Sequence, residues 1–432
     1  MAEGLVASRT LRASWGAWTG ATVQLALPEG WDALELSMRD APALSDGAIA
    51  RALDGPVGAP SLETLATGRS RAVIAIDDIT RPTRTAAPVS AVVRRLNAAG
   101  IADEAITILI ATGAHRAATA EDVRLKVGEL ASRIRVLSHD PVADVVETGV
   151  SLAGQAVRVN REWLAADLRI GVGGVLPHPF AGFSGGGKIV LPGLADLESV
   201  VRSHKYALMG FAGGIGLEKN KFRHDMERAV RSIGIDWTVN VVMNSRCETC
   251  HVVAGDCVEA HRAAAAAANE VGATAAPARP LDALVLNAYP KDSELLQVEA
   301  ALVALRAGMI DWLQPSAPVV LLGGCPEGLG THRLFGPGGR LFRTPAAKSY
   351  LRNRALHIVS PATAADAAHA AFWEGYPYHA DWDDCVSALA GELPERALVG
   401  YAPAGPLHMP QVAEWCSAQQ SSVGRRGAEE QR

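Results

Sequence analysis

The sequence lacks the features that mark several classes of protein. No apolar run reaches about eighteen residues, so no segment is expected to cross a bilayer as a helix. The net charge is −5 and no basic run stands out, so we expect neither nucleic acid nor a membrane as a partner. The N-terminus lacks the continuous apolar region of a secretory signal, and we therefore expect a cytoplasmic protein.

Cysteine is also scarce, with six residues in 432, which argues against a disulfide framework. Cys247 and Cys250, followed by His251, match the sequence motif of a covalent haem site. Such attachment normally follows export, and no export signal is recognised in the sequence. A zinc site would need a second pair at metal-binding spacing, and the other four cysteines are scattered singly. We interpret the cysteines as structural or incidental.

What the chain does contain is the pattern of an α/β protein. Short β-branched runs alternate with amphipathic stretches, which is typical of a parallel sheet covered by helices. In the first part of the chain we predict strands at 71–77, 105–111, 134–138 and 168–172, with helices at 86–99 and 119–127. In the second part we predict strands at 283–289, 317–322 and 355–359, with a helix near 292–307.

A small, Ala- and Pro-rich stretch at 268–280 separates the two series. We therefore predict two domains, each with a largely parallel sheet flanked by helices, and an active site in the cleft between them. Residues 1–275 would form the N-terminal domain and 276–416 a C-terminal domain that closes over the substrate. Residues 417–432 have the composition of a disordered tail.

Polar segments directly follow the strands predicted for the first domain. In open α/β sheets the ligand crevice lies outside the carboxyl ends of the strands, so these segments should converge. The segment Asp77–Thr83 combines carboxylates, hydroxyls and Arg81, and fits either an anion site or a solvated turn. His115 follows the second strand beside Gly113, although a lone histidine is more often structural. His139, after the third strand, is interpreted as structural.

Two further histidines have more specific surroundings. His178 lies between Pro177 and Pro179, so its backbone is held extended and its ring is suited to carry a proton near neutral pH. His204 lies on an apolar stripe with helical spacing, which favours a core histidine but is equally compatible with a metal ligand on a rigid helix.

The glycine run that ends at Lys188 invites comparison with a phosphate-binding loop. Gly182–Lys188 fits the first part of that motif, but Ile189 replaces the required Ser or Thr. Pro192 also falls where the helix of such a loop would begin.

Taken together, these segments resemble the nickel-dependent lactate racemase family of 2-hydroxyacid racemases and epimerases. The matching motifs are Asp78–Thr83, Thr112–Arg116, Ser138–Asp140 and His178–Lys188, with His204 sixteen residues further on. The ordered set is far more specific than any one motif, and similarity is densest over residues 75–210.

The resemblance implies a cofactor, a nickel pincer nucleotide: a pyridinium mononucleotide with two sulfur-bearing substituents, covalently attached to Lys188. Nickel would be bound by two sulfurs, one ring carbon and His204. Asp78, Ile79, Thr80 and Arg81 would also line the cofactor, and the glycines would let it lie against the backbone.

The resemblance also implies a reaction, inversion of C2 of a 2-hydroxy acid by reversible hydride transfer to the cofactor. One of His115 and His178 would take the hydroxyl proton and the other would return it from the opposite side. Arg81 would hold the substrate carboxylate. Dedicated maturation enzymes would be required as partners, and the enzyme would be a monomer or homodimer.

The second domain departs from the lactate-specific pattern. Gln297, expected to bind substrate, is present, but the lysine expected three residues later is Ala300. One cation is lost from the carboxylate site, which favours a substrate larger than lactate, such as a sugar acid. The alternatives are a carrier of nickel or cofactor without turnover and a nucleotide-phosphate hydrolase that uses the glycine loop.

Overall fold

The computed structural model describes residues 9–211 and 216–412, which divide into two compact units. Unit 1 takes its described residues from Met1–Asp40, Glu270–Gly330 and Thr344–Arg432, and unit 2 consists of Ala41–Asn269 and Thr331–Arg343. The expected boundary near residue 275 lies close to the division after Asn269. Two segments, however, lie in a different unit from the one that was expected for them.

The first of these segments is the N-terminal one. Its strand β3 (Trp31–Glu35) pairs in parallel with β19 (Ala397–Ala402), so the start of the chain completes the sheet of unit 1. The second segment, Thr331–Arg343, packs into unit 2, where Leu334 is fully buried. Both assignments depend on contacts between residues distant in sequence, which local patterns do not reveal. The expected tail, 417–432, lies outside the described residues.

Unit 2 is built on a six-stranded sheet with the order β13-β12-β9-β4-β5-β6. All neighbours are parallel except the β12–β13 hairpin at one edge. The strands of this sheet are β4 (Ala72–Asp77), β5 (Ile106–Ala111), β6 (Arg135–Ser138), β9 (Leu168–Gly174), β12 (Trp237–Met243) and β13 (Thr249–Gly255). Smaller antiparallel pairs are β7 (Val145–Leu152) with β8 (Gln155–Asn160), and β10 (Pro177–His178) with β11 (Gly182–Phe183).

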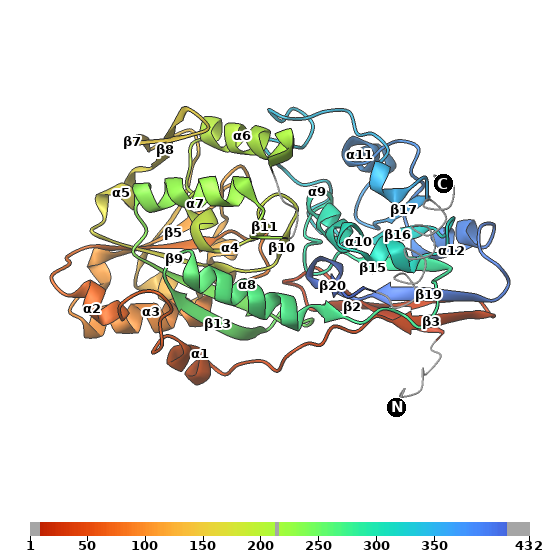
Figure 1. Cartoon of the computed structure of the whole chain (residues 1–432), viewed down its shortest axis with the longest axis horizontal. Coiled ribbons are helices and arrows are strands. Elements are labelled where there is room, and N and C mark those ends of the chain that lie inside the picture. The colour runs from red at the N-terminus through yellow and green to blue at the C-terminus, as the bar shows by residue number, and fades with distance from the viewer. Residues whose placement is uncertain (1–8, 212–215, 413–432) are drawn as a thin grey trace, which may run out of the picture. The chain divides into compact units, whose positions relative to one another are not determined.

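Helices cover both faces of this sheet (Figure 1). One apolar layer joins the sheet to α1, α2 and α3, and the other joins it to α5, α6 and α7. The helices of unit 2 are α1 (Asp46–Ala52), α2 (Leu62–Ala66), α3 (Ala86–Ala98), α4 (Ala120–Val127), α5 (Arg161–Ala165), α6 (Leu197–Tyr206), α7 (Lys221–Ile233) and most of α8 (Glu259–Val271). The strands are apolar on both faces because both are covered.

Unit 1 contains a second six-stranded sheet, all parallel, with the order β18-β17-β16-β15-β19-β3. The remaining strands of this sheet are β15 (Ala283–Asn287), β16 (Val319–Leu322), β17 (Leu356–Val359) and β18 (Tyr378–His379). Two further pairs are β1 (Thr10–Trp15) with β2 (Ala21–Ala26) and β14 (Ala273–Thr274) with β20 (Met409–Pro410). The helices of unit 1 are α9 (Leu295–Val298), α10 (Leu302–Arg306), α11 (Ala365–Ala371) and α12 (Trp382–Leu389).

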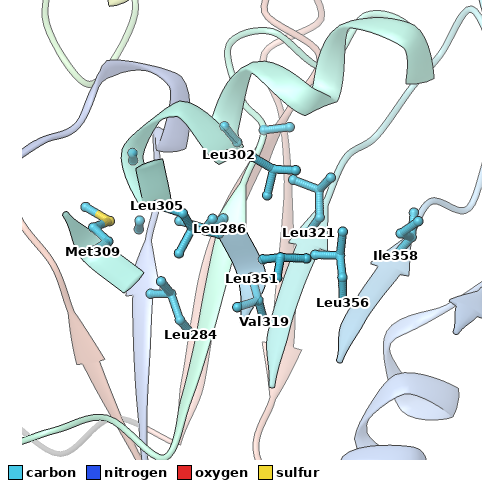
Figure 2. Packing of buried hydrophobic residues seen from close by; sticks show 14 of the residues in the cluster. Leu284, Leu286, Leu302, Leu305, Met309, Val319, Leu321, Leu351, Leu356 and Ile358 are labelled. Carbon is cyan, nitrogen blue, oxygen red and sulfur yellow. The ribbon is translucent and has the colours of Figure 1, made fainter. Parts of the chain in front are cut away.

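The two faces of the unit 1 sheet bury different apolar layers. Figure 2 shows Leu302 and Leu305 of α10 packed over Leu284 and Leu286 of β15. On the opposite face the hairpin β1–β2 and helix α12 contact the alternate residues of the same strands. Side chains one residue apart on a strand therefore enter different layers.

These observations confirm the expected fold class, two parallel α/β sheets flanked by helices. Each predicted strand of the first series overlaps an observed one, and Thr119 caps α4 with a complete capping box. Among the described residues, no helix is both long and apolar enough to cross a membrane.

Candidate functional site

The loops that follow β4 and β5 meet at the carboxyl edge of the unit 2 sheet. Asp78 Oδ2 accepts a hydrogen bond from His115 Nδ1 at 2.8 Å. Thr80 Oγ1 donates to the same carboxylate and lies 3.1 Å from His115 Nδ1, and Arg81 Nη1 donates to Thr80 Oγ1 at 3.3 Å. The predicted convergence of these two loops is confirmed.

A buried ion pair supports the Asp77–Thr83 segment from beneath. The amine of Lys126, which is fully buried, donates to Asp77 and to the carbonyl oxygens of Arg81 and Thr83. The second carboxylate oxygen of Asp77 accepts from Thr83 Oγ1 and from the backbone of Gly174, each at 2.8 Å. Lys126 was not predicted from the sequence, because its place on an ordinary amphipathic helix does not indicate the ion pair.

The bond to Asp78 determines the tautomer of His115. A carboxylate only accepts hydrogen bonds, so the proton of neutral His115 lies on Nδ1 and the lone pair on Nε2. A histidine so oriented can accept a proton at Nε2, and the carboxylate stabilises the resulting charge. Asp78 was expected only to line a cofactor, and in the structure it positions His115.

His178 has the opposite orientation. It pairs with Gly182 in the β10–β11 hairpin, and its Nδ1 accepts from the backbone N–H groups of Phe180 and Ala181 at 3.2 and 3.3 Å. The proton of neutral His178 therefore lies on Nε2, which is 2.9 Å from Lys188 Nζ. In this arrangement Nε2–H is the donor that faces the Lys188 amine.

The glycines before Lys188 have a different cause from the one expected. A Cβ atom at Gly186 would lie 2.8 Å from Arg223 Nη2 and from the carbonyl oxygen of Cys257, and φ is +57° there. At Gly185 φ is +78°, and a Cβ would meet Val175 at 2.6 Å. These two positions are occupied by protein rather than kept open for a cofactor, so packing and backbone conformation require glycine.

The same loop does not have the form of a phosphate site. Residues Gly186–Ile189 form a 3₁₀ turn, and the next α-helix begins only at Leu197. The Gly186 N–H donates to Asn240 Oδ1 at 2.9 Å. A phosphate loop needs its N–H groups directed at the ligand and a helix that starts at the loop.

His204 lies in the last turn of α6, as the spacing predicted. Its Nδ1–H donates to the Val200 carbonyl at 2.8 Å, so the lone pair lies on Nε2. Burial lowers the pKa of His204 to about 4, which keeps the ring neutral at pH 7. A neutral imidazole with its second nitrogen anchored by a carbonyl has the form of a metal ligand.

His332 was not predicted from the sequence, and it lies in the Thr331–Arg343 segment of unit 2. His332 forms an antiparallel bridge with His115, and the ring centroids are 4.9 Å apart. Its Nδ1 accepts from the N–H groups of Leu334 and Phe335 at 3.0 and 3.3 Å. Burial, with the nearby histidines, holds the pKa of His332 well below its usual value. Only the Thr-His-Arg spelling at 331–333, similar to Ala-His-Arg at 114–116, could have indicated it.

Aromatic contacts connect all of these histidines. In addition to the His115–His332 contact, Phe335 contacts His332 at 5.1 Å and His204 at 5.5 Å between ring centroids. Phe180 contacts His204 at 6.0 Å and His178 at 5.9 Å. The three predicted histidines therefore belong to one group within unit 2.

Three other predictions have different outcomes. His139 is buried, with its ring nitrogens bonded to Ala195 and Asn160, which confirms its structural interpretation. Cys247 and Cys250 are buried thiols whose Sγ atoms contact backbone carbonyl groups. Gln297 lies on α9 in unit 1, where its side chain donates to Glu294 at 3.3 Å, and its role with substrate stays a prediction.

The fold and the group of histidines define the class of protein. It is an α/β protein with a histidine-rich site on the segments that follow parallel strands. The chain matches the lactate racemase N-terminal domain family over residues 19–213. It is 28% identical over 289 residues to the lactate racemase of Thermoanaerobacterium thermosaccharolyticum and 29% identical over 287 residues to that of Lactiplantibacillus plantarum. Each match covers 65% of this chain and 66%, or just under two thirds, of the relative.

Solved structures agree in fold. The lactate racemase apoprotein from T. thermosaccharolyticum aligns with a TM-score of 0.72 at 22% identity, over 93% of this chain and all of that one. A protein from Thermotoga maritima aligns with a TM-score of 0.62 at 18% identity, over 87% of this chain and all of that one. These comparisons show that the chain is similar in sequence to lactate racemases and shares the fold of a lactate racemase apoprotein.

Proposed function

We propose that the protein is an isomerase that inverts C2 of a 2-hydroxy acid with a nickel pincer nucleotide attached to Lys188. The observation that carries the proposal is the opposed pair of histidines in one site. His115 presents a lone pair at Nε2 and His178 presents a proton there. Inversion requires one group that takes the hydroxyl proton and another that gives one back.

The residues of the site fit the proposed cofactor. The Lys188 amine lies 2.9 Å from His178 Nε2 and would attack an acyl or thioacyl carbon once uncharged, and His204 is a neutral ligand anchored at Nδ1. Among residues 9–211 and 216–412, no three His, Cys, Asp or Glu side chains converge at His204. The protein would supply one nickel ligand there and the bound group the others, and soft sulfur with imidazole suits nickel.

When bound, this group supplies a reversible acceptor for the C2 hydride. The protein contributes positioning and proton transfer. Arg81, on the loop fixed by Lys126 and Asp77, would bind the substrate carboxylate with its planar guanidinium. His115 would take the hydroxyl proton at Nε2 while Asp78 stabilises its charge, and His178 would return a proton from Nε2.

The substrate is proposed to be larger than lactate, because Ala300 stands where the resemblance leads us to expect a lysine. A hydrogen bond between a charged pair contributes about 1.5–3 kcal/mol. Its absence weakens a small acid held mainly by its carboxylate more than a polyhydroxy acid, which has several other groups to bind. Ala300→Lys should move the preference back towards lactate, as measured by kcat/KM on a panel of enantiopure acids followed by chiral chromatography.

The test of the whole proposal is an intact mass of protein made in a host that has the maturation enzymes. We expect a covalent adduct of mononucleotide size together with nickel, and both should be absent from Lys188→Ala. His204→Ala should keep the adduct and lose nickel. An active enzyme of unmodified mass would refute the attachment, and nickel binding without turnover of any 2-hydroxy acid would favour a carrier.

A further inference from the structure

A second group of histidines lies in unit 1 and takes no part in the site described above. It combines His357 of β17, His379 of β18 and Cys385 of α12. One ligand atom from each, two ring nitrogens and the Cys385 Sγ, lie within 4.8 Å of one another. Glu392, shortly after α12, accepts a hydrogen bond from His357 Nε2 at 3.0 Å.

The alternation of β17 places this group in the interior. Leu356 and Ile358 enter the layer under α10, visible in Figure 2, so His357 between them enters the opposite layer with Cys385. His357 and Cys385 are fully buried, and His379 is 9% exposed. Polar side chains from β17, β18 and α12 therefore meet in an otherwise apolar layer, where each must be satisfied.

Glu392 determines how His357 faces the other two side chains. The carboxylate fixes the proton of His357 on Nε2, so the lone pair at Nδ1 points towards His379 Nε2, 2.9 Å away. A carboxylate that holds one ring nitrogen while the other binds metal is the usual outer shell of a zinc histidine. The ring planes lie within 13° of each other with centroids 5.2 Å apart, so the two nitrogens point at each other and both rings must turn for their lone pairs to face one ion.

We propose that His357, His379 and Cys385 bind a zinc ion, with Glu392 as the residue that orients His357. Two imidazoles and one thiolate form a donor set that zinc prefers and that magnesium and calcium do not. Three protein ligands leave the fourth tetrahedral position to water. The site would join β17, β18 and α12, three elements far from Lys188 in sequence.

The proton and charge balance of binding is simple. His379 keeps its proton and moves it from Nε2 to Nδ1, while the Cys385 thiol loses one proton to solvent. The thiolate and Glu392 then offset the two positive charges of the ion, so no net charge is buried. Burial raises the pKa of the Cys385 thiol to about 12, so the thiol ionises near neutral pH only when a cation replaces its proton.

The competing interpretation is a group held together by hydrogen bonds alone. In that case Nε2–H of His379 donates to Nδ1 of His357, which donates in turn to Glu392. This chain satisfies both histidines at their contact but gives the nearby Cys385 thiol no function. The two interpretations differ in what removal of the thiol does to metal content.

The experiment measures zinc and nickel separately, by inductively coupled plasma mass spectrometry of the full-length chain after removal of any affinity tag. We expect about one zinc per chain, lost in Cys385→Ser and in His379→Gln. Cys325→Ser is the matched control, because Cys325 is another fully buried thiol of unit 1 outside the group, and it should retain zinc. Glu392→Gln should bind zinc about 10–100-fold more weakly.

Cobalt gives an independent signal. After chelation of zinc, Co²⁺ added to the parent chain should give thiolate-to-metal absorption that Cys385→Ser lacks. If Cys385→Ser does not fold, zinc binding is measured instead in Glu392→Gln, because Glu392 is partly exposed and its substitution should disturb the fold less. A parent chain with neither zinc nor the cobalt signal, or a folded Cys385→Ser that retains zinc, would overturn the proposal. The proposed cofactor site at Lys188 and His204 is measured by its nickel and this site by its zinc. A negative result for one proposal therefore leaves the other unaffected.

Discussion

The two units use buried histidines in different ways. In unit 2 the rings of His115, His178 and His204 project from loops and a helix end after parallel strands, and each Nδ1 is fixed by a different partner. In unit 1 His357 and His379 project from within strands and bond directly to each other. In the first arrangement each ring is held separately at Nδ1, whereas in the second two ring nitrogens face each other.

This difference shows how similar sheets support different chemistry. Loops beyond the carboxyl ends of strands leave room for a substrate. Their conformation depends on buried contacts such as the Lys126–Asp77 ion pair. Side chains within strands have fixed directions, which suits the short, rigid distances of a structural metal site.

The largest expected effect concerns the proton carriers of unit 2. His115→Ala and His178→Ala should each lower kcat for inversion of the best 2-hydroxy acid by about 10²–10⁴-fold, because each removes one general acid–base group. Covalent attachment and nickel content should remain, as measured by intact mass and elemental analysis. A near-normal kcat in His178→Ala would contradict the two-base scheme.

The next largest effect concerns the buried Lys126–Asp77 ion pair, which holds the loop that carries Arg81. Lys126→Met should lower the free energy of unfolding by about 3–5 kcal/mol, because it leaves the Asp77 carboxylate buried without its cation. Urea denaturation measures the change. Arg124→Met on the same helix is the control, since its pair with Glu121 is exposed and should contribute little. Equal effects in the two variants would show that the buried pair does not determine the loop.

A smaller effect is expected at His332, which contacts His115 but projects from the returning segment of the chain. His332→Phe keeps a ring against His115 and removes the acceptor for the Leu334 and Phe335 N–H groups. We expect kcat to fall about 10–100-fold, as for residues that orient others. His332→Asn, whose side-chain oxygen can accept the same bonds, should recover much of this loss. A near-normal kcat in His332→Phe together with a loss in His332→Asn would show that the ring contact, not the loop conformation, is what matters.

Sequence patterns predicted much of the fold because β4, β5, β9 and α3 carry continuous apolar runs or a clear helical stripe. The roles of His115, His178, Lys188 and His204 were expected from the family resemblance, because spacing alone left His115 and His204 open to a structural role. The patterns did not predict Lys126, His332 or β3, since each depends on contacts between distant segments. The packing reason for Gly186 could not be predicted either, because the space beside a glycine is known only when the fold is known.

The smallest expected effect compares one buried histidine from each unit through pH. Burial lowers the pKa of His139 in unit 2 to about 4 and that of His408 in unit 1 to about 3. In the unfolded chain both titrate near 6.5. As pH falls from about 6.5 towards 4, the unfolded chain therefore binds protons that the folded chain does not. Each histidine then lowers the free energy of unfolding by about 1.4 kcal/mol per pH unit, and above that window neither contributes to the slope.

Variants separate the two contributions. His139→Gln and His408→Phe should each reduce the slope between pH 4.5 and 6.5 by about 1.4 kcal/mol per pH unit, measured by urea denaturation at fixed ionic strength. They should differ at pH 7. His139→Gln removes bonds to Ala195 and Asn160, whereas His408 bonds only Thr274 and its Nε2 has no partner among the described residues. Since a buried polar atom without a partner is costly, His408→Phe should be the less destabilising change. An unchanged slope in either variant would show that its histidine is protonated in the folded chain.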